Sequence, residues 1–167
     1  MSVRTEPESY TPDLSGCDVE VCDALQLLVV VLVDLHLQAK QAHWNLVGHS
    51  FRSLHLHLDD IVDVARDAAD TFAERMRALG GFPDARASVV AATSTLLPAS
   101  QGIRSTEEAV RATATRLQAV SQELRAAHKI IERLDAPTAD LVNQTIVDVE
   151  KHGWMLQAEI RSSQVAG

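Results

Sequence analysis

The hydrophobic pattern along this chain is helical almost throughout. Apolar residues recur three and four positions apart over residues 19–45 and again over 51–79, which is the spacing that lines one face of a helix. Gly48 ends the first segment, Ser50 is placed to cap the second, and a Gly-Gly pair followed by Pro83 ends that one. No stretch alternates in the manner of a strand. The first half of the chain therefore predicts two long helices joined by a short turn.

The second half predicts two more long helices after an extended connection. Residues 82–104 form the connection, with a short helix over 87–92. A third long helix is expected over 105–134, and a fourth over 137–161 with a proline at its first position. A single long link, between the second and third helices, indicates an all-α fold: a ferritin-like four-helix bundle with a long crossover connection that carries a short helix.

The expected organisation is one domain between two polar ends. Residues 1–17 are predicted to form a flexible tail, 18–163 the bundle domain and 164–167 a short C-terminal tail. The longest apolar run, Leu25 to Val33, is too short to span a membrane, and no apolar stretch follows a basic start at the N-terminus. We therefore expect a cytoplasmic protein that does not enter a membrane.

The two cysteines, Cys17 and Cys22, lie near the start of the first predicted helix. A chain of this size builds its core without covalent staples. We expect reduced, half-buried thiols here rather than a disulfide or a metal clip.

The charge balance is acidic. The formal net charge is −8, and Lys40, Lys129 and Lys151 are the only lysines. An acidic surface repels nucleic acid and attracts cations. The composition thus favours the handling of cations over the binding of DNA.

Metal-competent side chains form a stripe on the second predicted helix. At about 100° per residue, His55, Asp59, Asp70 and Glu74 fall within roughly 100° of arc. Asp59 and Asp70 are nevertheless separated by about 16 Å along the helix axis, so they cannot share a metal ion within one chain. Either the stripe is an ordinary solvated face, or a second copy completes the site.

The positions in the stripe are symmetric about the helix middle, between Val64 and Ala65. If two copies of this helix pack antiparallel there, His55 and Asp59 of one copy face Glu74 and Asp70 of the other. A two-fold axis builds everything twice, so the dimer holds two sites, about 22 Å apart. His43, at the end of the first helix, is placed to complete each site. Asp63 and Arg66 share the same midpoint and are expected to face each other across the axis.

The ligand set would contain two imidazoles and three carboxylates. Such a mixture suits iron, although zinc and manganese fit the same donors. Ferritin-type bundles that hold two irons within one subunit use a Glu-x-x-His motif. This sequence has none, which favours the site shared between subunits.

Two stretches of the chain resemble the signature of the Dps family, the DNA-binding proteins from starved cells, also called mini-ferritins. They read KQAHWNLVGHSFRSLHLHLDD and DTFAERMRAL with its Gly-Gly ending, and a weaker match follows in TADLVNQTIVDVEKHGW. The resemblance implies that the family's ferroxidase ligands correspond, residue by residue, to His43, His55, Asp59, Asp70 and Glu74.

The resemblance also implies the function. A Dps-like protein is expected to form a hollow dodecamer built from two-fold dimers, to oxidise Fe(II) with hydrogen peroxide in preference to oxygen, and to store the ferric product as a mineral. Such a cage protects the cell from oxidative stress. The alternative is a nucleoid-binding protein that shields DNA and whose iron chemistry is secondary. This chain lacks the basic tail lysines of some relatives, so we expect DNA binding to be weak or absent. Leu56 stands where relatives often carry an acid, a difference expected to change the surroundings of the ligands or the surface on which mineral nucleates.

Several other residues have more than one interpretation. Trp44 either packs in the core or quenches oxidising equivalents beside the iron. His57 points away from the stripe and is expected to pack at the core edge, and Trp154 is expected to pack on the last helix. Asp140 and Asp148 match positions that border acidic iron-entry pores in relatives, but they read equally well as solvated acids.

Overall fold

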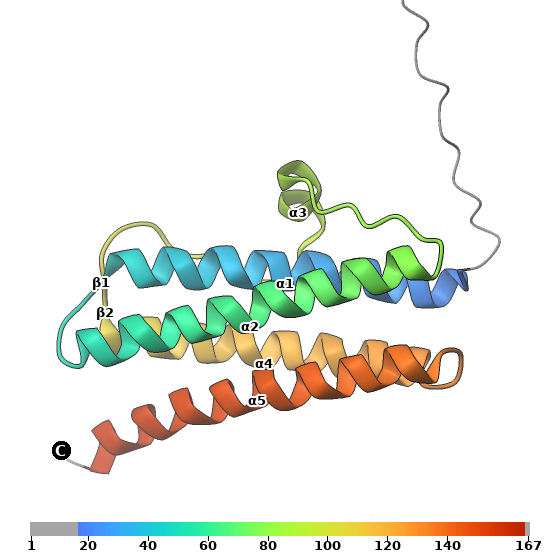
Figure 1. Cartoon of the computed structure of the whole chain (residues 1–167). Coiled ribbons are helices and arrows are strands. Elements are labelled where there is room, and N and C mark those ends of the chain that lie inside the picture. Colours follow the sequence, from blue (N-terminus) through green and yellow to red (C-terminus); the bar gives the residue numbers. More distant parts are fainter. Residues whose placement is uncertain (1–16, 166–167) are drawn as a thin grey trace, which may run out of the picture.

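Two antiparallel helix pairs stack on each other to make a four-helix bundle. The computed structural model describes residues 17–165, and side chains for residues 17–159. Helices α1 (Val19–Asn45) and α2 (Phe51–Ala78) form one pair, and α4 (Thr106–Ile131) and α5 (Ala136–Val165) form the other, as Figure 1 shows. The long connection carries α3 (Ala87–Thr93) across the outside of α1 and returns the chain to the start of α4. The predicted ferritin-like arrangement is confirmed.

Helices α1 and α4 begin at side chains that cap them, whereas Ser50, the predicted cap of α2, makes no side-chain cap hydrogen bond. The side chain of Asp18 accepts a hydrogen bond from the amide of Glu20 at the start of α1. Ser105 and Glu108 form a reciprocal capping box at the start of α4. These side chains satisfy amides that have no partner inside the helix. The α1 bounds match the sequence prediction, while α5 continues to Val165, four residues beyond the predicted end.

The core consists of thin aliphatic side chains from all four long helices. Phe72 on α2 is the largest fully buried side chain, and its surroundings are mainly leucine, isoleucine and valine. Fully buried members include Leu25, Leu28, Leu32, Leu35, Leu54, Leu58, Ile61, Leu117 and Leu124. Each such side chain contributes about 1.5–3 kcal/mol by leaving water, so the bundle holds together without covalent help. No helix within the described residues is long and apolar enough to cross a membrane.

A two-stranded parallel pair closes one end of the bundle, which the sequence analysis did not predict. Strand β1 (Leu46–Val47) follows α1 directly and pairs with β2 (Arg104–Ser105), the last residues before α4. Each strand has only two residues, which is too short for an alternating pattern to be read. The pair joins the α1–α2 turn to the start of α4 and so fixes where α2 begins.

The cysteines are also not as predicted. Cys17 and Cys22 form a disulfide, with their Cα atoms 6.4 Å apart. The expectation of reduced thiols is therefore wrong. Cys17 stands just before the N-cap and Cys22 one turn later, a separation within the usual range for a disulfide. Sequence spacing alone gives no information on whether both sulfurs turn to the same side.

Candidate metal centre

The two candidate histidine ligands lie face to face where α1 and α2 meet. His43 is the third residue from the end of α1, and His55 lies in the second turn of α2. Their rings are stacked, with centroids 3.6 Å apart and planes inclined by 23°. The ring of Phe51 stacks on the other side of His55, at a centroid distance of 5.0 Å. His43 is buried and His55 half-buried, so the antiparallel helix pair holds both imidazoles in place.

Backbone carbonyl groups hold one nitrogen of each ring. The Nδ1 of His43 lies 2.9 Å from the carbonyl oxygen of His55, and the Nδ1 of His55 lies 3.2 Å from the carbonyl oxygen of His43. A carbonyl oxygen only accepts, so each Nδ1 donates its proton in these bonds. In a neutral ring the lone pair is then on Nε2, the nitrogen available to a metal ion.

Asp59 adds a carboxylate beside this pair, and Lys40 neutralises it. Asp59 lies one turn after His55 on α2, with its Oδ1 3.2 Å from the Nδ1 of His43. The ammonium of Lys40 donates to the same Oδ1 at 2.5 Å and lies 3.4 Å from the Nε2 of His43. The hydrogen bond from Lys40 lowers the pKa of Asp59. Burial opposes this shift and is the second-largest effect, while the neighbouring charges of His43, Lys40 and His55 each lower the pKa by less, so the net shift is downward. Asp59 is therefore an anion at neutral pH.

The Lys40 ammonium lies between the Nε2 of His43 and the Oδ1 of Asp59. Sequence reasoning did not include Lys40 in the site. Its signal was present in the spacing, since Lys40 precedes His43 by three residues, and residues three apart on a helix are neighbours.

Asp70 and Glu74, by contrast, lie farther along α2 than the histidine pair. Both are exposed, and Asp70 borders an open cavity of about 560 Å³ that His36 and Arg66 also line. Within the described residues, no group of three or more His, Cys, Asp or Glu side chains is arranged to hold a metal ion. One subunit therefore brings His43, His55 and Asp59 into contact without arranging them around a metal position, and Asp70 and Glu74 lie apart from them on α2.

His57 does not belong to the candidate site and instead contacts a histidine on α5. The Nε2 of His57 lies 3.0 Å from the Nδ1 of His152 on α5, which is a packing role at the core edge. Burial, with the nearby charges of His57 and Lys151, lowers the pKa of His152 against the smaller opposing effect of Asp60 and Asp148.

The tryptophans are not core residues in the single chain. Trp44 is 67% exposed and Trp154 65% exposed. The packing role predicted for Trp154 is therefore wrong within one subunit, and the core-packing interpretation of Trp44 is excluded there in the same way. An exposed indole next to His43 leaves the interpretation of Trp44 as a quencher open.

The comparison with protein families identifies the fold class. Residues 22–164 match the family model described as a ferritin-like domain. Two proteins of Deinococcus radiodurans called DNA protection during starvation protein 2 and 1 are 30% and 32% identical to this chain over 95% and 83% of its length. The chain spans 64% of the length of the first and 67% of the second.

Solved structures give the same result over the full bundle. A structure titled as Dps from Microbacterium arborescens in the high iron form is 34% identical, has a TM-score of 0.79, and aligns with 87% of this chain and 97% of its own. DpsA14 from Streptomyces coelicolor is 32% identical with a TM-score of 0.80, over 83% of each chain. The bundle and its crossover are thus shared with these proteins.

Proposed function

Since the chain belongs to the Dps family of ferritin-like proteins, we propose that it is a ferroxidase and iron-storage protein. In this proposal it oxidises Fe(II) at sites shared between two subunits and stores the ferric product as a mineral inside a cage. The cage is a homo-oligomer, a dodecamer assembled from two-fold dimers. Iron is its substrate and cargo.

The observation that carries the proposal is the pair of stacked histidines beside an ionised aspartate. Both Nδ1 atoms are held by backbone carbonyls, so the Nε2 atoms are the nitrogens left to bind a metal, that of His43 after displacement of the Lys40 ammonium. Asp59 supplies a carboxylate whose Oδ1 lies 3.2 Å from the Nδ1 of His43, and the Lys40 ammonium contacts both this oxygen and the Nε2 of His43. Imidazole with carboxylate is a donor set that iron accepts, and it leaves positions open for an oxidant.

Three ligands from one chain leave a divalent ion incompletely surrounded. We propose that Asp70 and Glu74 of the partner subunit complete the site. Both are exposed on α2 in the single chain, and both lie on the stripe that contains His55 and Asp59. An antiparallel pairing of two α2 helices places them opposite those residues, and the two-fold axis produces a second, identical site.

The chemistry in this proposal uses hydrogen peroxide as oxidant. Two Fe(II) ions each give one electron, the O–O bond breaks, and two protons complete two molecules of water, so no hydroxyl radical is released. The carboxylates offset the growing positive charge, and the histidines fix the position of the ion; the electron transfer itself belongs to the metal. Trp44, exposed next to His43, is placed to reduce oxidising equivalents that escape.

The test is Fe(II) oxidation followed by ultraviolet absorbance after anaerobic loading, with peroxide or oxygen added in separate runs. The Asp59→Ala and Asp70→Ala proteins are each expected to lose rapid oxidation while they keep their helical content. Asp60→Ala is the matched control, because Asp60 is the exposed neighbour of Asp59 on another face of α2. Normal oxidation by both site variants would refute the proposal.

A mixture of the two variants tests whether the site is shared. In a dimer that contains one chain of each kind, one site lacks both aspartates and the other has both. Random assembly of equal amounts should therefore restore about a quarter of the sites. A site wholly within one chain gives no recovery at all, because neither variant chain has an intact set.

Relatives of this chain are named DNA protection during starvation proteins. We propose that this chain protects DNA by removing Fe(II) and peroxide rather than by coating the duplex. The nucleoid-binding alternative requires basic side chains that bind phosphate. A gel shift of the purified protein with DNA tests it.

A further inference from the structure

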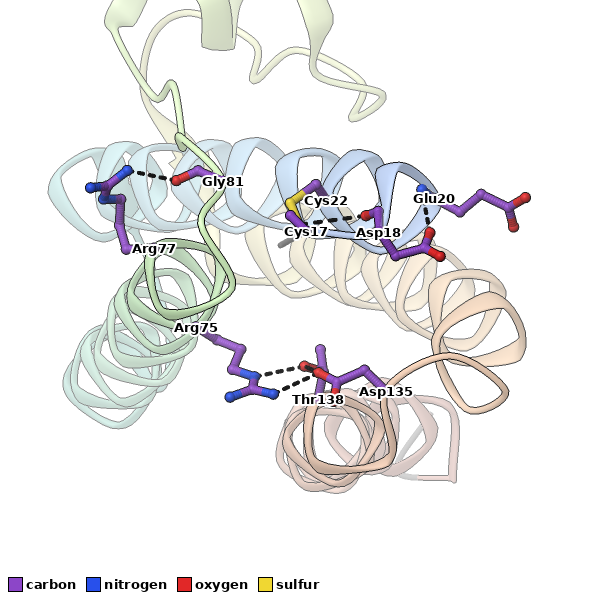
Figure 2. The surroundings of a disulfide bond; sticks show 9 residues. All are labelled: Cys17, Asp18, Glu20, Cys22, Arg75, Arg77, Gly81, Asp135 and Thr138. Carbon is purple, nitrogen blue, oxygen red and sulfur yellow. Dashed lines mark hydrogen bonds and ion pairs between the residues drawn. A yellow bond between two sulfur atoms is a disulfide. The ribbon is translucent and has the colours of Figure 1, made fainter. Parts of the chain in front are cut away.

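The disulfide lies at the junction between the first helix and the segment that precedes it. Cys17 comes immediately before the capping residue Asp18, and Cys22 lies one turn into α1 (Figure 2). The backbone of the same turn is already closed by the hydrogen bond from the amide of Cys22 to the carbonyl of Asp18, at 3.0 Å. The S–S bond therefore spans a turn that the helix would form without it.

One of the two sulfurs is fixed by packing. A Cβ atom built on Gly81 would lie 2.5 Å from the Sγ of Cys22 and 2.8 Å from the Cγ of Met76. Cys22 is thus packed against the loop that follows α2. Cys17, in contrast, connects directly to residues 1–16. The disulfide joins a packed side chain to the first described residue of the chain.

The contribution of this bond to the stability of the bundle is expected to be small beside that of the core. A disulfide stabilises a fold mainly by closing a loop in the unfolded chain, and the gain is smallest for short loops. Here the sequence separation is only 5 residues, and the aliphatic core extends over all four long helices. Both cysteines are also only half-buried, so small oxidants and reductants reach them.

We propose that Cys17 and Cys22 are a redox-responsive dithiol pair, which hydrogen peroxide oxidises to the disulfide and a dithiol reductant reopens. One thiol attacks the peroxide, the O–O bond breaks, and a sulfenic acid and one water form. The second thiol attacks that sulfur, the S–S bond forms, and a second water leaves. Two thiols and one peroxide thus give one disulfide and two waters.

The reverse reaction is thiol–disulfide exchange. A dithiol reductant attacks one sulfur, forms a mixed disulfide, and leaves as its own oxidised form. Reduction frees Cys17 from Cys22, while the cap at Asp18 and the contact between Cys22 and Gly81 remain. The state of the pair therefore decides whether Cys17 is tied to the first turn of α1.

The experiment uses the full-length, metal-free protein with a chelator, so that its outcome is independent of the proposed iron chemistry. The protein is treated with dithiothreitol under argon, desalted, exposed to an equivalent of hydrogen peroxide and quenched with an alkylating reagent. Mass spectrometry is expected to find two alkylated cysteines before peroxide and none after it, with the link inside one chain. A bond that opens only after denaturation, or thiols that peroxide leaves unchanged, would overturn the proposal.

Single cysteine variants show which thiol forms the sulfenic acid. In Cys17→Ser and Cys22→Ser the remaining thiol has no partner, so peroxide should leave a sulfenic acid there that dimedone traps. Amide hydrogen exchange at Cys17 and Asp18 should become faster in the reduced native chain, whereas exchange at Cys22, whose amide keeps its bond to the carbonyl of Asp18, should stay the same. The Cys17→Ser/Cys22→Ser double variant is the matched control, in which reductant should not change that exchange. Equal exchange in the oxidised and reduced native chain would refute the switch.

Discussion

Two backbone carbonyl groups determine what the histidine pair is able to bind. Each accepts the Nδ1 proton of the opposite imidazole, so the two helices set each other's tautomers. The arrangement depends on the tight turn after α1, where Ser50 adopts a left-handed conformation with φ of 61°. A residue outside the site thus helps to aim both Nε2 atoms.

At the same scale, Gly81 is predicted to be sterically irreplaceable. The Gly81→Ala variant should lose about 1–3 kcal/mol of unfolding free energy, because the added methyl group meets Cys22 and the side chain of Met76. Urea unfolding of the oxidised protein at fixed concentration measures the loss.

Gly153→Ala is the control for that measurement. A Cβ at this position in α5 would lie 3.9 Å from the Cβ of Leu117, an ordinary contact. Alanine in a helix interior should then stabilise the protein by about 0.5–1 kcal/mol. A Gly81→Ala protein as stable as the native chain would contradict the close packing of the disulfide.

At the scale of the elements, a polar contact ties α2 to the turn before α5. Arg75 on α2 donates to Asp135 at 2.7 Å and to Thr138 at 2.8 Å, and Thr138 donates to Asp135 (Figure 2). Burial alone would raise the pKa of Asp135, but the hydrogen bonds from Thr138 and Arg75 outweigh it, and the net shift is downward.

The direction of that shift predicts a pH dependence. A carboxyl group whose pKa is lower in the folded state stabilises the fold above its unfolded pKa, about 3.9, and this stabilisation is lost as the pH falls through the folded value. Asp135→Asn should therefore cost about 1–2 kcal/mol at pH 7, with the difference from the native protein shrinking below about pH 4. Thermal midpoints across this pH range test it.

An exposed pair provides the comparison for Asp135. Glu107 and Arg111 form an i,i+4 ion pair on the surface of α4, and such pairs contribute well under about 1 kcal/mol. Glu107→Gln should leave the midpoint almost unchanged at every pH. A loss as large as that of Asp135→Asn would mean that net charge, rather than the tie between α2 and α5, controls the result.

The pairing of two α2 helices predicts a second pair of contacts. Asp63 and Arg66 are both exposed in the single chain, and an antiparallel two-fold would set Asp63 against the partner's Arg66. Asp63→Arg should weaken the dimer, since it places like charges together, with each pair contributing less than about 1 kcal/mol. Native mass spectrometry or sedimentation measures the dimer.

Charge reversal at both positions should restore that association. The Asp63→Arg/Arg66→Asp double variant rebuilds the pair with opposite polarity. If it associates no better than the single variant, the two-fold axis lies elsewhere on α2, although His43, His55 and Asp59 would keep their positions.

The helices could be predicted from sequence because their signals are local. Ser105 and Glu108 mark the start of α4 within four residues, and hydrophobic spacing reveals the buried side of each helix. The two-residue pair of β1 and β2 could not, since its partners are far apart in the chain and each is too short to show a pattern. The disulfide and the contact of Lys40 with Asp59 depend on side-chain directions, which composition does not contain.

At the scale of the whole molecule, the acidic charge predicts weak DNA binding. Duplex affinity depends on cations that displace counterions from phosphates. Residues 1–17 contain a single basic residue, Arg4, and the chain carries a formal net charge of −8. Assembly multiplies that charge, so avidity has little attraction to amplify.

A gel shift of the purified protein at low salt and pH 7.5, with chelator present, should show no retarded complex. Histidine protonation below about pH 6.5 reduces the negative charge, so a run at lower pH is the informative comparison. A clear complex at pH 7.5 would support the nucleoid-binding alternative.

The lysine that lies against Asp59 gives the site a competitor tethered to the protein. Its ammonium contacts the same carboxylate oxygen that a metal ion would use, so every incoming cation must displace it, at a cost that does not depend on which cation arrives. A monovalent ion such as sodium exchanges one charge for another and gains little. A divalent ion that also bonds to imidazole nitrogen gains both charge and covalency. If the proposed site binds iron, Lys40 would therefore act as a selectivity threshold that monovalent salt ions do not overcome and that transition-metal ions do.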